Sequence, residues 1–377
     1  MLEHVKSLLD SIRLPLENFK ESEQIRVESK INSFKQIETH RTCPTNGKNV
    51  DISVMNNTLQ AMFTKSRNHI FNKTLKDAAQ HKIAEYFSLY CDDVKMQTFE
   101  MRTSHESFDG VNVIGVKHGK HKGTADDKLI IIGAHYDTVK EAPGVEDNGS
   151  GVTALLELLR VYSSRTSVSK FSVMFITFDL EEQGCLGSFV FVKEYLISEV
   201  KQSKFFGAII MDMIMVYNPN ANSQLIPEDI YECNSETVNV IKQDGNIGNF
   251  LSVMRRTVLD KDLWEQFHDS WNQHADTQKY KLFNFTVPFS FDVRDDFILN
   301  HSNFIRSDHA SFWLFEKKLK TFALPALFLS DTGPFRYPTC SKYHTIEDDE
   351  TQITLDNLSF LKNTVDVLLH FLLKGEE

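Results

Sequence analysis

The sequence is poor in cysteine and has no paired-cysteine motif. Its five cysteines lie far apart in a chain of 377 residues, and none of them has CxxC spacing. Thiolate zinc sites need closely spaced cysteines, and a dense disulfide framework needs many cysteines in a short chain. The pattern favours neither, and a single disulfide is the only covalent cross-link left open.

The sequence also lacks a long apolar run and an excess of basic charge. No stretch of about 18 uncharged apolar residues occurs, so we expect no membrane-spanning helix. Residues 1–20 interleave charged and apolar residues at helical spacing and lack the apolar centre of a signal peptide. We therefore expect a cytoplasmic protein, with export after removal of a signal peptide as the alternative. A net charge of -11 argues against binding to nucleic acid or to an acidic membrane.

Strand-like and helix-like segments alternate over much of the chain. Strand patterns cover residues 94–102, 111–119, 128–138, 171–179, 205–216 and 324–333, and helical patterns cover residues 75–90, 151–164, 187–200, 307–318 and 354–374. Such alternation is typical of a sheet covered by helices. We predict an α/β fold with three αβα layers, in which a mixed, mostly parallel central sheet is flanked by helices on both faces.

Two parts of the chain depart from this rhythm. Residues 1–40 have helical spacing throughout and are predicted to form an N-terminal helical segment. The main domain would then span residues 41–377. Within it, the alternation weakens at about 218–303, where turn residues and the aromatic-rich run KLFNFTVPFSFDVRDDF occur. We interpret this part as an insertion or lid that walls a substrate pocket.

Acidic and histidine side chains follow several of the predicted strands. They are His135 in IIIGAHYDT, Asp147 in VEDNGSG, Glu181 and Glu182 in FDLEEQGCLGS, Asp212 in AIIMDMIM, and His344 in YHTIEDD. Ligands of open α/β sheets bind beyond the carboxyl ends of the strands, so these side chains are expected to meet there. Two imidazoles and three carboxylates suit a pair of divalent metal ions. The remaining carboxylate would be a base.

The first of these residues also have plain structural interpretations. His135 and Asp137 are two residues apart, so both point to one side of an extended chain, and the carboxylate would brace a metal-bound imidazole. The alternative is a surface HxD turn. Asp147 would otherwise cap the following helix. The adjacent Glu181 and Glu182 would otherwise be solvated surface, although they directly follow a strongly apolar run.

The last two residues differ in how unusual their positions are. Asp212 interrupts an apolar strand, and a buried carboxylate costs several kcal/mol unless it is paired or bound to metal. A structural salt bridge is its alternative role. His344 lies in a polar loop, where a lone histidine is usually only solvated. It is singled out because it completes the ligand count.

The ordered motifs from about residue 40 to the C-terminus resemble the co-catalytic zinc exopeptidases typified by bacterial leucyl aminopeptidases, peptidase family M28. GAHYDT and RSDHASFW are moderately specific, whereas five such motifs in the correct order are strongly so. The resemblance implies two zinc ions, with cobalt or manganese also compatible. It assigns His135 and Asp212 to one ion, Glu182 and His344 to the other, and Asp147 to both.

The resemblance also implies the remaining roles. Glu181 would be the general base, Asp137 would orient His135, and the peptide bond between Asp147 and Asn148 would be cis. A metal-bridging hydroxide would attack the peptide bond, so the function implied is an aminopeptidase that removes N-terminal residues from peptides. The alternatives are a carboxypeptidase of the same family, a glutaminyl cyclase-like acyltransferase and a noncatalytic binding domain. The protein would be a monomer or a homodimer.

One departure from the family pattern concerns the substrate pocket. A tyrosine that assists the oxyanion in some members aligns with Phe304, which has no hydroxyl. Arg306 is then a candidate replacement donor or a clamp for a substrate carboxylate. Asp308, in the run SDH, is a second candidate substrate-binding residue. The adjacency of serine, aspartate and histidine in that run is no indication of a catalytic triad, whose members meet through space.

Overall fold

A computed structural model describes residues 26–33, 47–102, 107–165, 168–199, 204–290, 294–319 and 324–374. Its strands, within these ranges, form one nine-stranded sheet in the order β1-β2-β3-β5-β4-β6-β9-β7-β8. The strands are β1 (Arg26–Ser33), β2 (Asp93–Arg102), β3 (Ser107–Lys117), β4 (Lys128–His135), β5 (Phe171–Phe178), β6 (Lys204–Met211), β7 (Phe250–Arg256), β8 (Lys281–Val287) and β9 (Ala326–Ser330).

The centre of this sheet is parallel. Strands β5, β4, β6 and β9 are hydrogen-bonded neighbours and run in the same direction. Antiparallel pairing begins on either side, with β3 against β5 and β7 against β9. The carboxyl ends of the four central strands therefore lie at one edge of the sheet, where the predicted site residues follow them.

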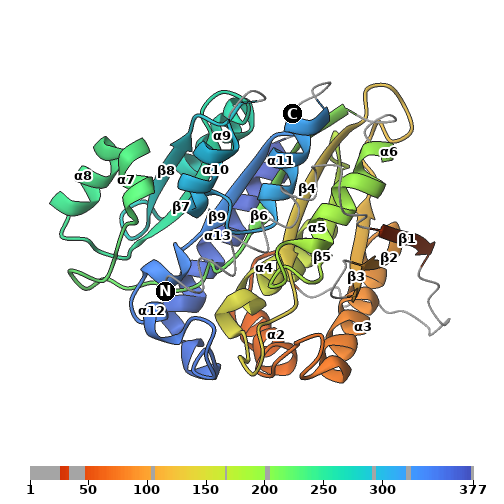
Figure 1. The fold of residues 1–377 in the computed structure, drawn as a ribbon, viewed down its shortest axis with the longest axis horizontal. Coiled ribbons are helices and arrows are strands. Elements are labelled where there is room, and N and C mark those ends of the chain that lie inside the picture. Colours follow the sequence, from red (N-terminus) through yellow and green to blue (C-terminus); the bar gives the residue numbers. More distant parts are fainter. Residues whose placement is uncertain are drawn as a thin grey trace.

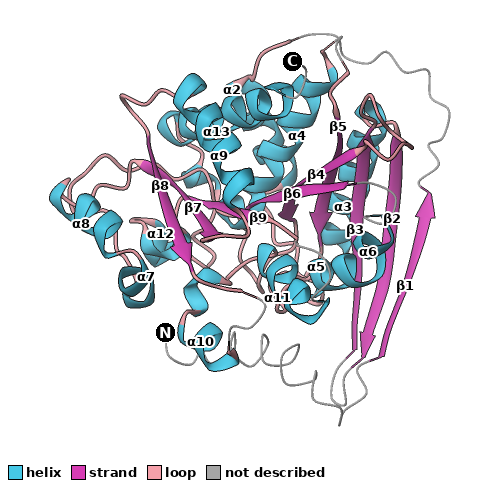
Figure 2. Cartoon of the chain, turned by 90° about the horizontal axis from the view of Figure 1, so that it is seen from above, coloured by secondary structure: helices cyan, strands magenta, loops and turns pink. Residues whose placement is uncertain are grey.

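Helices cover both faces of the sheet, as Figures 1 and 2 show. One layer contains α2 (Ile52–Met62), α3 (Lys73–Tyr90), α4 (Gly151–Ser163), α9 (Lys261–His274) and α13 (Leu355–Leu373). The other contains α5 (Leu186–Val190), α7 (Glu228–Cys233), α8 (Ser235–Gln243), α10 (Asp295–Asn300) and α11 (His309–Leu319). The predicted three-layer α/β fold with a mixed sheet is confirmed.

Strand β4 shows why both layers are needed. Ile130 and Ile132 pack into the core on the α4 side, whereas Leu129 and Ile131 pack into the core on the α11 side. Side chains alternate between the faces of a strand, so an apolar run without alternation must be buried on both. The sequence of β4 therefore requires helices above and below it.

The predicted N-terminal helical segment is wrong at Arg26–Ser33, which forms strand β1. This strand pairs antiparallel with β2 over its whole length, from Arg26 opposite Arg102 to Ser33 opposite Lys95. Pairing with the neighbouring strand satisfies the backbone, so spacing along the sequence alone misled the helix prediction. The rest of residues 1–40 lies outside the described residues.

The interval 218–303 adds to the sheet. Its strands β7 and β8 are parallel to each other, and β7 joins the sheet through β9. The interval also supplies α7, α8, α9 and α10. A lid role for part of it and the division of the chain at residue 40 stay predictions.

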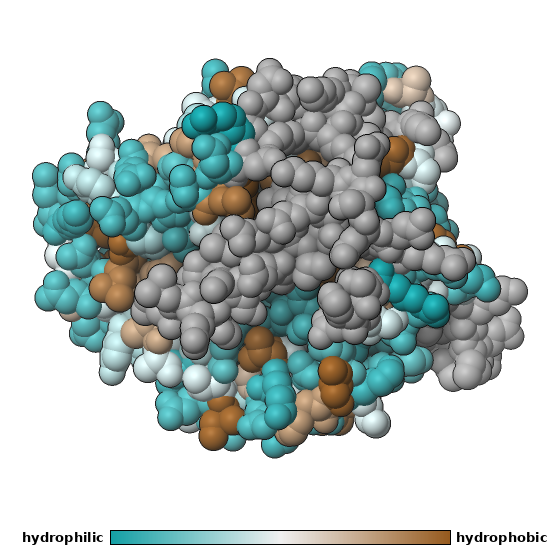
Figure 3. Space-filling view, in the orientation of Figure 1, coloured by the Kyte–Doolittle hydropathy of each residue, from teal (hydrophilic) through white to brown (hydrophobic). Residues whose placement is uncertain are grey.

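The surface gives two further observations. Within the described ranges, no helix combines the length and the apolar character that crossing a bilayer requires. The face in Figure 3 is mostly hydrophilic where it is coloured, with small separate apolar areas along its lower part.

Candidate metal centre

The six predicted metal-site residues are delivered by the carboxyl-end edge of the sheet. His135 ends β4, Asp212 follows β6 directly, and Glu181 and Glu182 lie in the turn after β5. His344 follows the short helix α12 (Thr339–Lys342), after β9. Asp147 lies in the turn Val145–Ser150, which leads into α4. Parallel neighbouring strands thus bring residues 209 positions apart in sequence, His135 and His344, to one place.

The predicted ligands form two groups that share Asp147. His135, Asp147 and Asp212 make up the first group, and Asp147, Glu182 and His344 make up the second; within each group, one ligand atom per residue lies within 4.8 Å of the others. His135 Nε2 lies 3.3 Å from Asp147 Oδ1 and 3.5 Å from Asp212 Oδ1. His344 Nε2 lies 3.2 Å from Asp147 Oδ2 and 3.1 Å from Glu182 Oε2. The two oxygens of Asp147 thus face different groups.

Three buried polar atoms of the first group have no hydrogen-bond partner among the described residues. Both ring nitrogens of His135 and Oδ1 of Asp212 are buried and make no hydrogen bond. Buried polar groups are normally hydrogen-bonded, because an unpaired group pays its desolvation cost without compensation. Imidazole and carboxylate atoms that converge without bonding one another fit a divalent cation. The residues present therefore suit a metal ion.

The charges of the site lead to the same conclusion. Burial acts to raise the pKa of Asp147, but His135 and His344 outweigh it and hold the pKa below its usual range. Burial lowers the pKa of His344, but the carboxylates of Glu182 and Asp147 outweigh it and raise the pKa to about 10. Bound cations would supply the same positive charge to these acids and leave the imidazoles neutral, as ligation requires.

Glu181 belongs to neither group but faces the centre. Its Oε2 lies 4.0 Å from His135 Nε2, and its Oε1 lies 3.4 Å from Cys185 Sγ. Burial raises the pKa of Glu181 well above its usual value, and Glu182 adds to this effect against the opposing imidazole of His135. A carboxylate with an increased proton affinity next to the ligands is placed to accept a proton.

Asp137 links the two loops that carry these residues. Its Oδ1 lies 3.4 Å from His135 Nδ1 and accepts a hydrogen bond from the backbone N–H of Glu181. Its Oδ2 accepts a hydrogen bond from the backbone N–H of Glu182. One side chain therefore fixes the imidazole and the acidic pair relative to each other. The peptide bond between Asp147 and Asn148 is cis, as predicted.

Two positioning residues were missed by the sequence analysis. Asp348 accepts hydrogen bonds from the backbone N–H groups of Glu146, at 2.8 Å, and Asp147, at 3.0 Å. Arg67 is buried and donates to backbone carbonyls, among them those of Tyr136 and Gly144. The only sequence signal for Asp348 is its place in the acidic stretch four residues after His344. No sequence pattern identifies Arg67, because it donates hydrogen bonds to backbone carbonyl groups, which every residue has.

The two candidate substrate-binding residues lie on one segment. Asp308 is fully buried, and neither of its carboxylate oxygens has a hydrogen-bond partner. Burial raises its pKa to about 7. Arg306 is half-buried and donates to Asn303 Oδ1 and to the Tyr343 hydroxyl. His309 bonds through Nε2 to the Phe304 carbonyl, so it does not form a triad with its neighbours.

Residues 112–251 match the model of peptidase family M28. This match covers less than half of the chain. The matched segment contains His135, Asp147, Glu182 and Asp212, together with Glu181, whereas His344 lies beyond it.

Curated relatives match about a third of the chain. The aminopeptidase YwaD of Bacillus subtilis is 37% identical over 111 residues, which are 29% of this chain and 22% of the relative. Aminopeptidase Y of Saccharomyces cerevisiae is 31% identical over 139 residues, 37% of this chain and 23% of the relative. The chain thus spans about a fifth of the length of these relatives.

Solved structures share the fold over nearly the whole chain. A leucine aminopeptidase precursor from Bacteroides thetaiotaomicron is 16% identical, with a TM-score of 0.56, over 86% of this chain and 97% of its own. A glutaminyl cyclase from the same organism is also 16% identical, with a TM-score of 0.55, over 86% and 98%. This fold is therefore found in proteins with different chemistry, and the fold alone does not choose between them.

Proposed function

We propose that the protein is a zinc-dependent aminopeptidase that hydrolyses N-terminal residues from peptides. The observation that carries this proposal is the pair of ligand groups that share Asp147, with Glu181 beside them and outside both. Such an arrangement suits two metal ions and one separate base. Two zinc ions fit the histidine and carboxylate donors, and cobalt or manganese would also be accepted.

The chemistry follows from the position of each side chain. A pair of bound cations would supply Lewis acidity and make a water molecule more acidic. Glu181 accepts the proton of the attacking water and returns it to the departing amine. Its buried position favours the first of these steps, because burial raises its affinity for protons. Asp137 keeps His135 and the turn with Glu181 in register during this transfer.

The charge of the pocket favours capture of an amine. Asp308 is buried with two unpartnered oxygens, and the charges of His135, Asp137 and Asp212 act on its pKa. A substrate ammonium would give this carboxylate the partner that it lacks. This favours an aminopeptidase over a carboxypeptidase. The names of the curated relatives, both aminopeptidases, support the same choice.

The other two alternatives fit the site less well. A glutaminyl cyclase-like enzyme would use one zinc ion, and the second ligand group would then have no role. A noncatalytic binding domain would have no need for a complete set of ligands. Both ligand groups are complete in the described residues.

The proposed function is tested by metal analysis together with a panel of peptides. Purified full-length protein is loaded with zinc, its bound metal is counted, and it is given dipeptides with a free amine or an acetylated amine. We expect two zinc ions per chain and cleavage only of the free-amine peptides. Cleavage of both forms would assign a different specificity, and no cleavage of either would refute the peptidase proposal.

The cytoplasmic location and the choice between monomer and homodimer stay predictions from the sequence. A peptide substrate is the partner that the proposed chemistry requires.

A further inference from the structure

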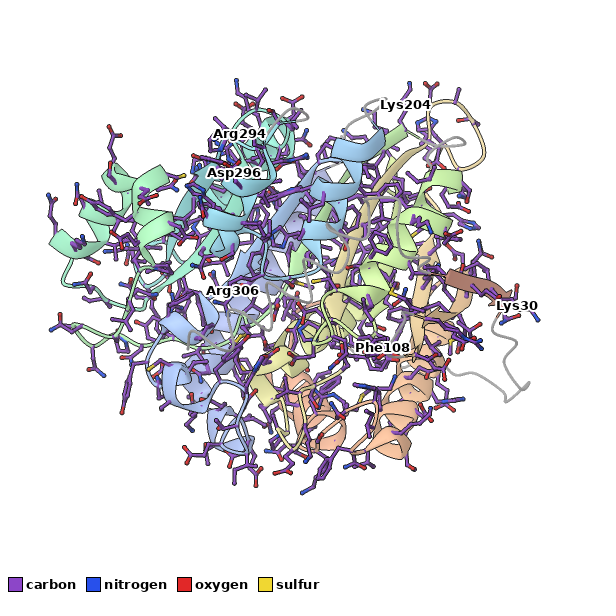
Figure 4. All side chains as sticks on the ribbon, viewed as in Figure 1. Lys30, Phe108, Lys204, Arg294, Asp296 and Arg306 are labelled. Atoms are coloured by element: carbon purple, nitrogen blue, oxygen red, sulfur yellow. The ribbon has the colours of Figure 1, made fainter. Side chains whose placement is uncertain are left out.

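Arg306 emerges from a segment that is otherwise deeply buried. Phe304, Ile305, Ser307 and Asp308 have no exposed surface, whereas Arg306 is half-buried. Figure 4 places Arg306 in the middle of the molecule. The guanidinium of Arg306 lies near the second ligand group, because it donates to the hydroxyl of Tyr343, the residue that precedes His344.

The guanidinium is held in a fixed position. Its Nη1 donates to Asn303 Oδ1 at 3.1 Å, and its Nη2 donates to the Tyr343 hydroxyl at 3.3 Å. Its central carbon lies 5.2 Å from the ring centre of Phe335 and 5.8 Å from that of Tyr343. An arginine held by aromatic rings and neutral acceptors has already lost much of its side-chain entropy. Binding of a ligand to it would therefore cost less.

The positive charge has no acidic partner among the described residues. The half-buried Arg306 contrasts with Arg160, which pairs with Glu157, and Arg256, which pairs with Asp260. The acceptors of Arg306 are an amide and a phenol, both neutral. A guanidinium has five N–H donors in a fork that matches a carboxylate, so donors remain for an anion.

The Tyr343 ring lies between the guanidinium of Arg306 and the second ligand group. The Tyr343 ring stacks on the His344 ring, with ring centres 3.7 Å apart. His344 in turn faces Asp147 and Glu182. An extended peptide spans about 3.3–3.6 Å per residue, so one or two residues beyond the cleaved bond would cross such a ring.

We propose that Arg306 binds the C-terminal carboxylate of the substrate, so that the enzyme prefers dipeptides and tripeptides with a free carboxyl end. The inference rests on the proposed function and deepens it. Carboxylates of the centre would take the ammonium end of such a peptide, and Arg306 would take the other end. Long polypeptides and C-terminal amides offer no carboxylate at this distance.

Binding is measured first, so that turnover is not needed for the test. The zinc-loaded Glu181→Gln protein is titrated by calorimetry with leucylglycine and with leucylglycine amide. Charge-assisted hydrogen bonds are the strong ones, and we expect the acid to bind at least ~10-fold more tightly than the amide. Adding Arg306→Gln should bring this ratio close to one, and Arg306→Lys should leave an intermediate ratio, because lysine keeps the charge but not the fork.

Arg294→Gln is the matched control. Arg294 is an exposed arginine that pairs with Asp296, and both are labelled near the upper edge of Figure 4, away from Arg306. The Arg294→Gln variant should show the same ratio of leucylglycine affinity to leucylglycine amide affinity as the parent protein. Thermal melting of each variant shows whether a change in affinity comes from the lost contact or from unfolding. If Arg306→Gln does not fold, Arg306→Lys is used to test the proposal.

The outcomes separate this inference from the proposed function. If unsubstituted enzyme cleaves both peptides with equal kcat/KM, or if the ratio survives Arg306→Gln, the role of Arg306 is refuted and the aminopeptidase stands. If neither peptide is cleaved but the acid binds selectively through Arg306, the proposed function is wrong and the carboxylate site stands. Binding of neither peptide overturns both.

Discussion

Asp348 holds Asp147 through the backbone: its Oδ2 accepts a hydrogen bond from the Asp147 N–H at 3.0 Å, across 201 positions of sequence. Its Oδ1 accepts a second bond from the N–H of Glu146. The carboxylate that both ligand groups share therefore owes its position to a residue in the loop that also carries His344.

Asp348→Asn should weaken the centre without removing a ligand. Asparagine keeps one acceptor oxygen and turns a donor toward the other buried N–H, which costs about 1–3 kcal/mol of unfolding free energy. Loss of such support typically weakens metal affinity by about 10–100-fold. Urea unfolding and zinc titration measure the two effects. Glu347→Gln, at a neighbouring exposed position, is the control and should change neither. An unaltered zinc affinity in Asp348→Asn would show that the bond does not support the site.

Glu181→Gln and Glu182→Gln should separate the base from the ligand. Glutamine at 181 leaves both ligand groups intact, so two zinc ions should stay bound while kcat falls by about 10²–10⁴ or more, since a general base contributes that much. Glutamine at 182 removes an anionic donor from the second group, so zinc should be lost from it. Metal analysis of the purified variants and steady-state kinetics with a free-amine dipeptide test both statements. Equal zinc content in the two variants would contradict the assignment.

Asp147→Asn and Asp212→Asn should differ in the number of ions affected. Asp147 serves both groups, whereas Asp212 serves only the first. We expect Asp212→Asn to retain one zinc ion of ordinary affinity and Asp147→Asn to bind both ions weakly. Isothermal titration of metal-free protein with zinc distinguishes one strong step from none. Two independent strong steps in Asp147→Asn would show that Asp147 is not shared.

Arg67→Lys should destabilise the loops around the centre. Arg67 donates to the carbonyls of Tyr136, Pro143 and Gly144. Lysine has fewer N–H donors, and their geometry does not match that of the guanidinium, so it cannot replace these three bonds. Buried carbonyls left unpaired cost about 1–3 kcal/mol of unfolding free energy. Arg102→Lys, at an exposed arginine, should leave the free energy of unfolding of the parent unchanged. Chemical denaturation of both variants provides the comparison, and equal stabilities would rule out an anchoring role for Arg67.

The residues that the sequence identified share one property: their chemistry is visible in the residue type. His135, Asp147 and Asp212 interrupt or end apolar runs, so a polar side chain at those places stands out. The structure brings all three within ligand distance of one another. The alternation of apolar runs likewise predicted the central strands and the helices that cover them.

What the sequence did not show depends on contacts that leave no local pattern. Strand β1 has charged residues in alternation, and only its pairing with β2 makes it a strand. Strands β7 and β8 were obscured by the turns and short helices between them. Asp348 and Arg67 contact backbone groups, which carry no information about residue type, so their roles depend on how distant loops meet.

The spacing of the parallel strands β5, β4, β6 and β9 determines how far apart the ligands of the candidate metal centre lie. Adjacent strands are spaced about 4.7–4.9 Å apart, and the ligands begin at or just after the ends of these strands. The strand spacing would thus set the separation of the two proposed ions. A larger or smaller cation would have to be accommodated by rotation of carboxylates rather than by movement of the scaffold, so changes of metal should alter coordination geometry while the spacing stays nearly constant.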